Sequence, residues 1–398
     1  MKKFAVASLL LACTLTAGAK GKEKVKEEGY VFTPVKELKI TPVKNQSRSS
    51  TCWSYSGIGF LESELLRLGK PEYDLSEMFV VSHSYKDKAD KYVRLHGKLN
   101  FAPGGSFYDV LYVWKHYGAV PETVMNGLNY GEPQNVHNEL DAVSRAYVDA
   151  VIKNPNGKLT PAWKKGFDGI VDAYLGELPA KFTYNGKEYT PKSFADELGL
   201  NADDYVSITS YTHQPFYQPF VLEIEDNWRG AYSYNVPLDE MMAIMRNAID
   251  KGYTIAWGAD VSEKGFNRDG IGVVPDVQVL ETSGSDQDRW VGLSQKEKDE
   301  EIKKMISKPC KELEITQEMR QQGYDNYQTT DDHGMLIYGI ATDQNGKEYF
   351  MVKNSWGTNN KYKGTWYVSD AYAAYKTMNF VVHKDAVPAE IAMKLGIK

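Results

Sequence analysis

The stretch that decides the fold is Thr41-Pro-Val-Lys-Asn-Gln46-Ser-Arg-Ser-Ser-Thr-Cys52-Trp53-Ser-Tyr55, in which a glutamine lies six residues before a cysteine. Directly after it, apolar residues recur at steps of three and four from Ile58 to Leu68. This spacing predicts a helix with one buried face, which Gly69 and Pro71 end. The cysteine therefore lies close to a helix start.

Cys52 is the candidate nucleophile. If Ser50 or Thr51 is the N-cap, Cys52 falls in the first turn, where unpaired backbone N–H groups and the helix dipole favour a thiolate. Attack on a carbonyl creates an oxyanion, which the Gln46 amide and the Cys52 N–H can stabilise. A lone cysteine at a helix start is more often a small core residue, but Gln46 and the adjacent Trp53 favour the catalytic interpretation.

A predicted hairpin brings a base and its orienting group together. Met335–Thr342 and Glu348–Lys353 have strand patterns, and Asn345-Gly346 between them is a typical hairpin turn. His333 and Asn354 would then emerge side by side at one end. The asparagine can accept a hydrogen bond from one imidazole nitrogen and so fix the tautomer that presents the other to the thiol.

Together, these positions resemble the papain-like cysteine peptidases, through Gln46, Cys52-Trp53, His333 and the run Asn354-Ser355-Trp356-Gly357. The resemblance implies an α+β fold of two lobes. A helical lobe would carry Cys52, and an antiparallel β-barrel-like lobe would carry His333 and Asn354. The histidine lies 333 − 52 = 281 residues after the cysteine, whereas about 130 to 150 is usual for papain. A large helical insertion is therefore implied.

Further stretches resemble the branch with such an insertion, the bleomycin hydrolases and aminopeptidases C. They are Gly104–Leu111, His116–Pro121, Tyr234–Pro237 and Trp257–Val261. In that fold the glycine pair lines the cleft, although a tight turn before a helix would equally explain it. Trp356 could shield the histidine–asparagine bond from water. The candidates for substrate binding are Gly104, Gly105, Trp53 and Trp356.

The chain divides into four predicted parts. Residues 1–19 form a signal peptide, and 20–129 form a leader and the helical lobe. Residues 130–235 form the insertion, and 236–398 form the sheet-rich lobe. The insertion has helical patterns at Glu139–Lys153 and Pro191–Leu198 but no chemical motif. Its expected roles are to shape the cleft and to make subunit contacts. Relatives of this branch form barrel-like oligomers, so a homo-oligomer is expected.

Composition excludes several classes of function. The chain has 398 residues with 42% hydrophobic content, and its 47 basic and 53 acidic residues are interspersed. This is the composition of a globular protein without a positive field for nucleic acid or an anionic membrane surface. The sequence also lacks a His-Glu-x-x-His motif, paired Cys-x-x-Cys motifs and a glycine-rich phosphate loop. We therefore expect no metal and no cofactor.

The N-terminus predicts export to the periplasm or beyond the cell. Met1-Lys2-Lys3, the apolar run Phe4–Leu15 and Ala17-Gly18-Ala19 are the three parts of a signal peptide, and the run is too short for a permanent span. Alternatively, Cys13 could be a lipoprotein anchor. Cleavage after Ala19 would leave only Cys52 and Cys310, which we expect to be free thiols.

The predicted activity is hydrolysis of peptide bonds through a thioester. Removal of N-terminal residues is the favoured mode, because the insertion could narrow the cleft or Lys398 could reach it. In the resembled branch a C-terminal Pro-Trp-Asp-Pro-Met-Gly-type tail binds the substrate's amino group, and Val387–Lys398 does not match that tail. An endopeptidase with an open cleft is the first alternative. A binding or scaffold protein with little turnover is the second.

Overall fold

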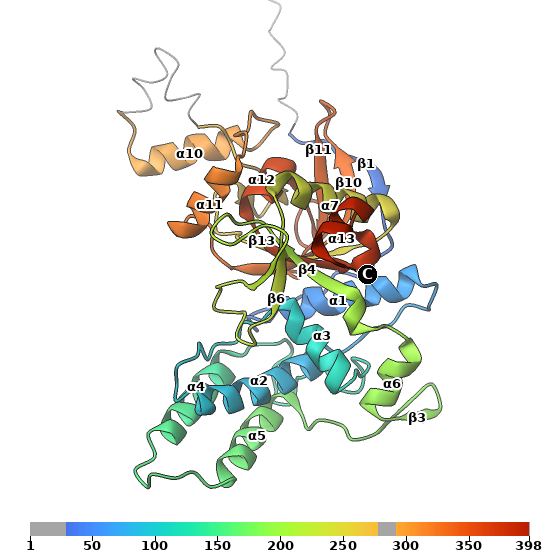
Figure 1. Ribbon diagram of the computed structural model, residues 1–398, viewed down its shortest axis with the longest axis vertical. Coiled ribbons are helices and arrows are strands. Elements are labelled where there is room, and N and C mark those ends of the chain that lie inside the picture. The colour runs from blue at the N-terminus through green and yellow to red at the C-terminus, as the bar shows by residue number, and fades with distance from the viewer. Residues whose placement is uncertain (1–28, 278–291, 398) are drawn as a thin grey trace, which may run out of the picture.

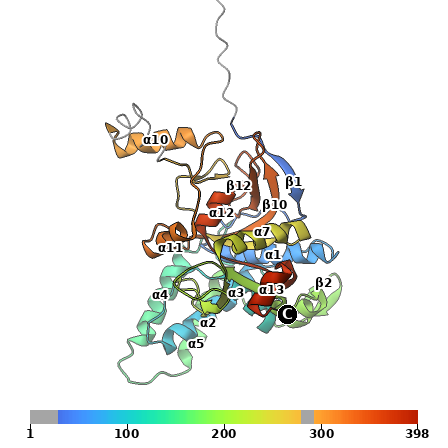
Figure 2. The same ribbon diagram turned by 45° about the horizontal axis from the view of Figure 1, so that its top comes forward.

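The computed structural model describes residues 29–277 and 292–397. Within these ranges the protein has two lobes, with most of the strands gathered in one and most of the early helices in the other (Figure 1). Helix α1 (Cys52–Arg67) lies between them, as both views show (Figure 2). The nucleophile candidate therefore starts an element that contacts both lobes.

The helical lobe is built around α1. Its apolar face is buried, with Leu61 and Leu65 at most 1% exposed. The Ser76 hydroxyl caps the next helix by accepting a hydrogen bond from the Phe79 N–H at 2.9 Å, a favourable arrangement for a helix start. The other helices of this lobe are α2 (Glu77–Arg94), α3 (Phe107–His116), α4 (Asn138–Ile152), α5 (Ala162–Leu175) and α6 (Pro191–Leu198).

The second lobe is organised on a sheet of eleven strands within the described ranges. Its main path runs β5-β6-β4-β13-β7-β10-β11-β12-β9-β8, and β1 pairs with β10. The strands are β1 (Thr33–Glu37), β4 (Tyr205–Thr209), β5 (Pro219–Val221), β6 (Tyr232–Asn235), β7 (Ile255–Ala259), β8 (Phe266–Asn267), β9 (Ile271–Gly272), β10 (His333–Thr342), β11 (Glu348–Lys353), β12 (Thr365–Ser369) and β13 (Thr377–His383).

Strand β10 is the centre of this sheet. It pairs antiparallel with β7 and with β11, in a register that sets Leu336 opposite Lys353. Gly346 in the connecting turn has φ +80°, a conformation that favours glycine. The predicted hairpin is thus confirmed, and its open end places His333 at the start of β10 and Asn354 directly after β11.

Helices cover the sheet and small elements complete the fold. Helix α7 (Leu238–Lys251) and helix α13 (Ala389–Leu395) share one apolar cluster with the strands. Lys394 of α13 forms an ion pair with Glu240 of α7 at 2.5 Å. The remaining elements are β2 (Phe182–Tyr184), β3 (Lys187–Tyr189), η1 (Ala202–Asp204), α10 (Gln295–Met305), α11 (Gln317–Asp325), α12 (Asp370–Lys376) and η2 (Lys384–Ala386). No helix within 29–277 or 292–397 has the length and apolarity of a membrane span.

The sheet includes strands from parts of the chain that the sequence predicts to belong to regions other than the sheet-rich lobe. Strand β1 comes from the part 20–129 predicted as leader and helical lobe, and β4, β5 and β6 come from the predicted insertion. The link is β4, which pairs antiparallel with β13 near the C-terminus. Such pairing depends on partners about 170 residues apart in the chain. The two helices predicted in the insertion are present as α4 and α6.

Candidate active site

Cys52 is the first residue of α1, with Thr51 at the N-cap. The Thr51 side chain does not cap the helix but shares a 2.6 Å hydrogen bond with the Ser49 hydroxyl. Ser47 and Ser50 have positive φ values of 52° and 56°. Non-glycine residues adopt this conformation rarely and often near functional sites. The loop before the helix is therefore held in a specific, partly strained shape that presents the cysteine.

His333 and Asn354 are joined by a short hydrogen bond. The distance from His333 Nε2 to Asn354 Oδ1 is 2.7 Å, and the same oxygen accepts the Ser355 N–H at 2.7 Å. Because a carbonyl oxygen can only accept, Nε2 must carry the proton. The other imidazole nitrogen, Nδ1, is then left as the acceptor for a thiol proton.

One pocket at the junction of the lobes contains both the sulfur and the imidazole. Cys52 and Trp53 line it from the helical lobe, and His333 and Gly334 line it from β10. Gly105 also lines this pocket, which we call the catalytic pocket. Its remaining lining residues are Ser106, Phe107, Ile224, Asp226, Gly258, Asp331, Asp332 and Asn379. The sequence-predicted nucleophile and base therefore face one common space.

The predicted substrate-binding glycines differ in what they contact. A Cβ at Gly105 would lie 2.8 Å from the Trp53 ring, so Gly105 lets the chain pass close to the nucleophile's neighbour. A Cβ at Gly104 would lie 2.1 Å from an oxygen of Asp226. Gly104 does not line the catalytic pocket itself. Because Gly104 has no side chain, the carboxylate of Asp226, which does line the pocket, can lie against its backbone.

Trp356 covers the histidine from the outside. Its ring stacks on the His333 imidazole with centroids 4.7 Å apart, while Trp366 packs edge-on against it at 5.4 Å. Trp356 is 38% exposed and does not line the catalytic pocket. This placement is compatible with the predicted shielding of the hydrogen bond. The predicted role of Trp356 in substrate binding has no support from the residues that line the pocket.

Gln46 is fixed by the residue that follows Asn354. The Ser355 hydroxyl donates to Gln46 Oε1 at 2.5 Å, and the Gln46 N–H donates to the Ser355 carbonyl at 2.8 Å. With Oε1 occupied, the amide nitrogen Nε2 has no protein partner within the described ranges. Gln46 is 7% exposed and does not line the catalytic pocket as defined above. The free Nε2 is nevertheless the donor that an oxyanion would require.

Burial controls the ionisation of Cys52. It raises the pKa of the thiol to about 12, an effect that the carboxylates of Asp226 and Asp331 increase. Hydrogen bonds from the backbone N–H groups of Gly334 and Trp53 act in the opposite direction but are weaker. The thiolate expected from the helix start is thus not the resting form, because desolvation outweighs the N–H groups.

The imidazole responds to the same environment. Burial lowers the pKa of His333 to about 4, against the hydrogen bond to Asn354, which raises it. At pH 7 these pKa values favour a neutral thiol and a neutral imidazole. Moving the thiol proton to Nδ1 changes the charge distribution but not the number of protons, so the pair can react without exchanging a proton with solvent.

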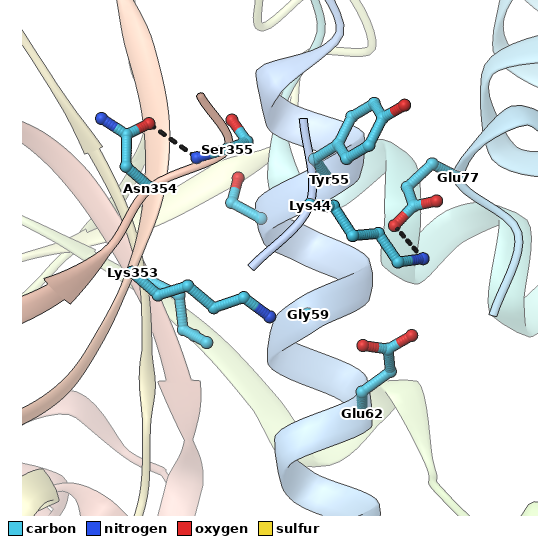
Figure 3. Close-up of a pocket in the computed structure, with 10 residues that line it drawn as sticks. Lys44, Tyr55, Gly59, Glu62, Glu77, Lys353, Asn354 and Ser355 are labelled. Carbon is cyan, nitrogen blue, oxygen red and sulfur yellow. Dashed lines mark hydrogen bonds and ion pairs between the residues drawn. The ribbon is translucent and has the colours of Figure 1, made fainter. Parts of the chain in front are cut away.

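Behind Asn354 lies a buried cluster of charged side chains at the lobe interface (Figure 3). Lys44 forms an ion pair with Glu77 at 2.8 Å. Lys353, the residue before Asn354, donates to the Thr41 hydroxyl at 2.9 Å, and this hydroxyl donates to Glu62 at 2.6 Å. The cluster connects α1 to β11 directly beneath the site and so holds the lobes in register.

Two carboxylates of the catalytic pocket carry no role in the sequence-based interpretation. Asp331 lies two residues before His333, and only the histidine of this stretch has a role predicted from the sequence. Asp226 lies in the predicted insertion, 174 residues after Cys52 by 226 − 52. Its neighbours Glu225 and Asn227 form no recognisable motif. Only the fold brings Asp226 to the nucleophile.

Comparison with known proteins agrees with this geometry. Residues 309–397 match the Peptidase C1-like family. Aminopeptidase C of Streptococcus thermophilus is 22% identical over 92% of this chain and 84% of that protein. Aminopeptidase C of Listeria monocytogenes is 23% identical over 89% and 83%, respectively. In structure, PepW from Lactobacillus rhamnosis HN001 matches with a TM-score of 0.66 at 20% identity, over 92% of this chain and 84% of that one.

The match to PepW establishes the fold, and the matches to aminopeptidases C cover nearly the whole chain. A large sheet, a helical lobe and a cysteine at the start of the helix between them are the features that the sequence predicts. The chain has the papain-like cysteine peptidase fold, its residues 309–397 match the Peptidase C1-like family, and most of its length is similar to aminopeptidases C.

Proposed function

We propose that this peptidase is an aminopeptidase in which Cys52, His333 and Asn354 act together. The observation that carries the proposal is the 2.7 Å hydrogen bond from His333 to Asn354, in a pocket that the Cys52 residue also lines. The bond selects the imidazole tautomer whose free nitrogen can accept the thiol proton. A base prepared in this way is what a neutral thiol requires.

The reaction would proceed in two halves. As the Cys52 sulfur attacks the peptide carbonyl carbon, its proton passes to His333 Nδ1, and the oxyanion accepts hydrogen bonds from the Cys52 N–H and Gln46 Nε2. The C–N bond then breaks, His333 protonates the departing amine, and a thioester remains. Water attacks the thioester with His333 as base, which releases the carboxylic acid and restores the thiol.

Removal of N-terminal residues is supported by the relatives, several of which are named aminopeptidase C. In this chain, residues 389–397 form α13 and its short extension, which packs against the sheet lobe. None of them lines the catalytic pocket. Lys398 lies outside the described residues. Among the described residues, the groups that could recognise the substrate's amino terminus are therefore those of the pocket wall.

A pair of reporters tests the mode of cleavage. We expect leucyl-aminomethylcoumarin, with its free amino group, to be hydrolysed at least about tenfold more efficiently than the N-acetylated reporter. The reason is that an ionic contact to the ammonium group is worth roughly 1.5–3 kcal/mol. The ratio of kcat/KM values for the two reporters gives the answer. A preference for the acetylated reporter would favour an endopeptidase instead.

Export is a separate part of the proposal and depends on the N-terminal residues alone. Residues 1–19, including Cys13, lie outside the described part of the chain. We propose that signal peptidase removes them, which predicts a mature chain beginning at Lys20. The intact mass of the protein recovered from cells would test this, since an uncleaved start at Met1 or a lipid-modified Cys13 would each give a different mass. Homo-oligomerisation stays a prediction.

A further inference from the structure

The wall of the catalytic pocket is acidic. Asp226, Asp331 and Asp332 line it together with Cys52 and His333, while no lysine or arginine is among its lining residues. The described part of the chain places no group of three or more acidic, histidine or cysteine side chains to hold a metal ion. The pocket is thus suited to an organic cation.

The three carboxylates differ in how they are satisfied. Asp332 accepts hydrogen bonds from the N–H groups of Val261 and Ser262 at 3.3 and 3.1 Å and from the Thr330 hydroxyl at 2.8 Å. Across residues 29–277 and 292–397, by contrast, the side chains of Asp226 and Asp331 have neither a hydrogen bond nor an ion pair. Partly buried carboxylates in protein are normally paired. Asp226 and Asp331 are therefore free to bind a ligand.

The loop that carries Asp226 is firmly attached to the helical lobe. Arg229 donates to Asp109 at 2.6 Å and to Asp87 at 2.8 Å, and Asp109 also accepts the Ser106 N–H at 2.8 Å. Asp109 is fully buried. The loop between β5 and β6 is thus anchored beside the N-terminus of α3, which holds Asp226 over Gly104 at the edge of the pocket.

The pKa values of Asp226 and Asp331 also indicate that these carboxylates lack a cationic partner in the pocket. Burial, together with the negative charges of Asp226 and Asp332, raises the pKa of Asp331 to about 8. Burial also raises the pKa of Asp226 to about 6, although Lys88 opposes this. Lys88 does not bond to Asp226, because its ammonium donates to the carbonyls of Ala102 and Gly104. At pH 7 Asp331 is therefore mainly protonated and Asp226 mainly ionised, and the positive charge of a bound ammonium group would favour ionisation of both.

We propose that Asp226 and Asp331 bind the α-ammonium group of the substrate's N-terminal residue and thereby set the position of cleavage. This inference rests on the proposed aminopeptidase function and names the group that performs its recognition step. Neither residue takes part in the chemistry. They act by holding the first residue of the peptide with its carbonyl carbon at the Cys52 sulfur.

The dimensions of an amino acid favour this ligand over a basic side chain. In an N-terminal residue, a single Cα separates the ammonium from the carbonyl carbon that is attacked. A lysine side chain would place its ammonium four methylene groups from its own Cα. Because the nucleophile and both carboxylates line one pocket, the short separation fits the site directly. It also explains why a blocked N-terminus, which has no charge, would bind poorly.

The test compares Asp226→Asn, Asp331→Asn and the double variant on three reporters at pH 7.5. These are leucyl-aminomethylcoumarin, its N-acetylated form and N-acetyl-lysyl-leucyl-aminomethylcoumarin. We expect kcat/KM for the free-amine reporter to fall about 10- to 100-fold in Asp226→Asn, mainly through KM, and further in the double variant. Turnover of the acetylated reporter should stay within about twofold, which a general loss of structure would not allow.

Glu225→Gln is the matched control, since it removes a negative charge from the adjacent, exposed residue and should leave all three rates unchanged. The rate of Cys52 alkylation in each variant checks that the site is intact. If wild type prefers the free amine but the variants keep that preference, the inference is wrong while the aminopeptidase function stands. If wild type prefers the acetylated lysyl-leucyl reporter and the variants lose it, the carboxylates bind a side chain and both proposals fail.

Discussion

Replacing Cys52 by alanine should reduce peptide hydrolysis by roughly 10⁶-fold, which is the size of the loss when a nucleophile of such a triad is removed. Without the sulfur no thioester can form, and His333 has no thiol proton to accept. The fold should survive, because Cys52 is only partly buried at the first position of α1 and alanine is the best helix former. Steady-state kinetics and urea unfolding measure the two effects.

Cys310→Ala is the control for this prediction. Cys310 is also a free, partly buried thiol, and burial raises its pKa to about 11. Its neighbours are Tyr30 and Glu312, not an imidazole. Turnover should therefore be unchanged in this variant. Residual hydrolysis near the wild-type rate in Cys52→Ala would show that another group performs the reaction.

Glu62→Ala should lower the free energy of unfolding by about 3–5 kcal/mol, the usual cost of removing one partner from a buried charge cluster. Glu62 is 2% exposed and accepts hydrogen bonds from the Thr41 hydroxyl and the Leu75 N–H. Its charge also favours the protonated forms of Lys44 and Lys353. Without it, both ammonium groups stay buried with less compensation at the lobe interface.

Urea unfolding followed by circular dichroism would measure this loss. Asp196→Ala is the comparison, because Asp196 forms an exposed ion pair with Lys192 on α6. Such surface pairs contribute only about 0–1 kcal/mol. An equal effect of the two substitutions would mean that the buried cluster does not hold the lobes together. A stable Glu62 variant with lost activity would instead show that the cluster mainly positions Asn354.

The local elements could be predicted because their signals lie within short segments. The apolar spacing after Ile58 and the turn at Gly69 define α1, and the Asn345-Gly346 turn defines the hairpin that carries His333 and Asn354. Each of these features needs only neighbours along the chain. That α1 and the hairpin lie together in space could be predicted only from the resemblance to a known family. No local pattern joins Cys52 to His333, which are 281 positions apart.

What the sequence could not reveal depends on long-range packing. Asp226 reaches the catalytic pocket because β4 pairs with β13 and because Arg229 anchors its loop to Asp109. Neither contact leaves a local pattern in the sequence. The helix start alone predicts a thiolate at Cys52, and burial opposes that prediction. The extent of this burial follows from the closure of two lobes. Desolvation is a property of the fold and not of a motif.

The central claim is that Cys52 is the nucleophile served by His333. Treatment with radiolabelled iodoacetamide at pH 6, followed by peptide mapping and an activity assay, tests it most directly. Although burial raises the pKa of both thiols, only Cys52 shares a pocket with an imidazole that can accept its proton. The account therefore predicts that label enters Cys52 and not Cys310, that one equivalent abolishes hydrolysis, and that His333→Ala slows the labelling. Label confined to Cys310, or full activity with Cys52 alkylated, would contradict it.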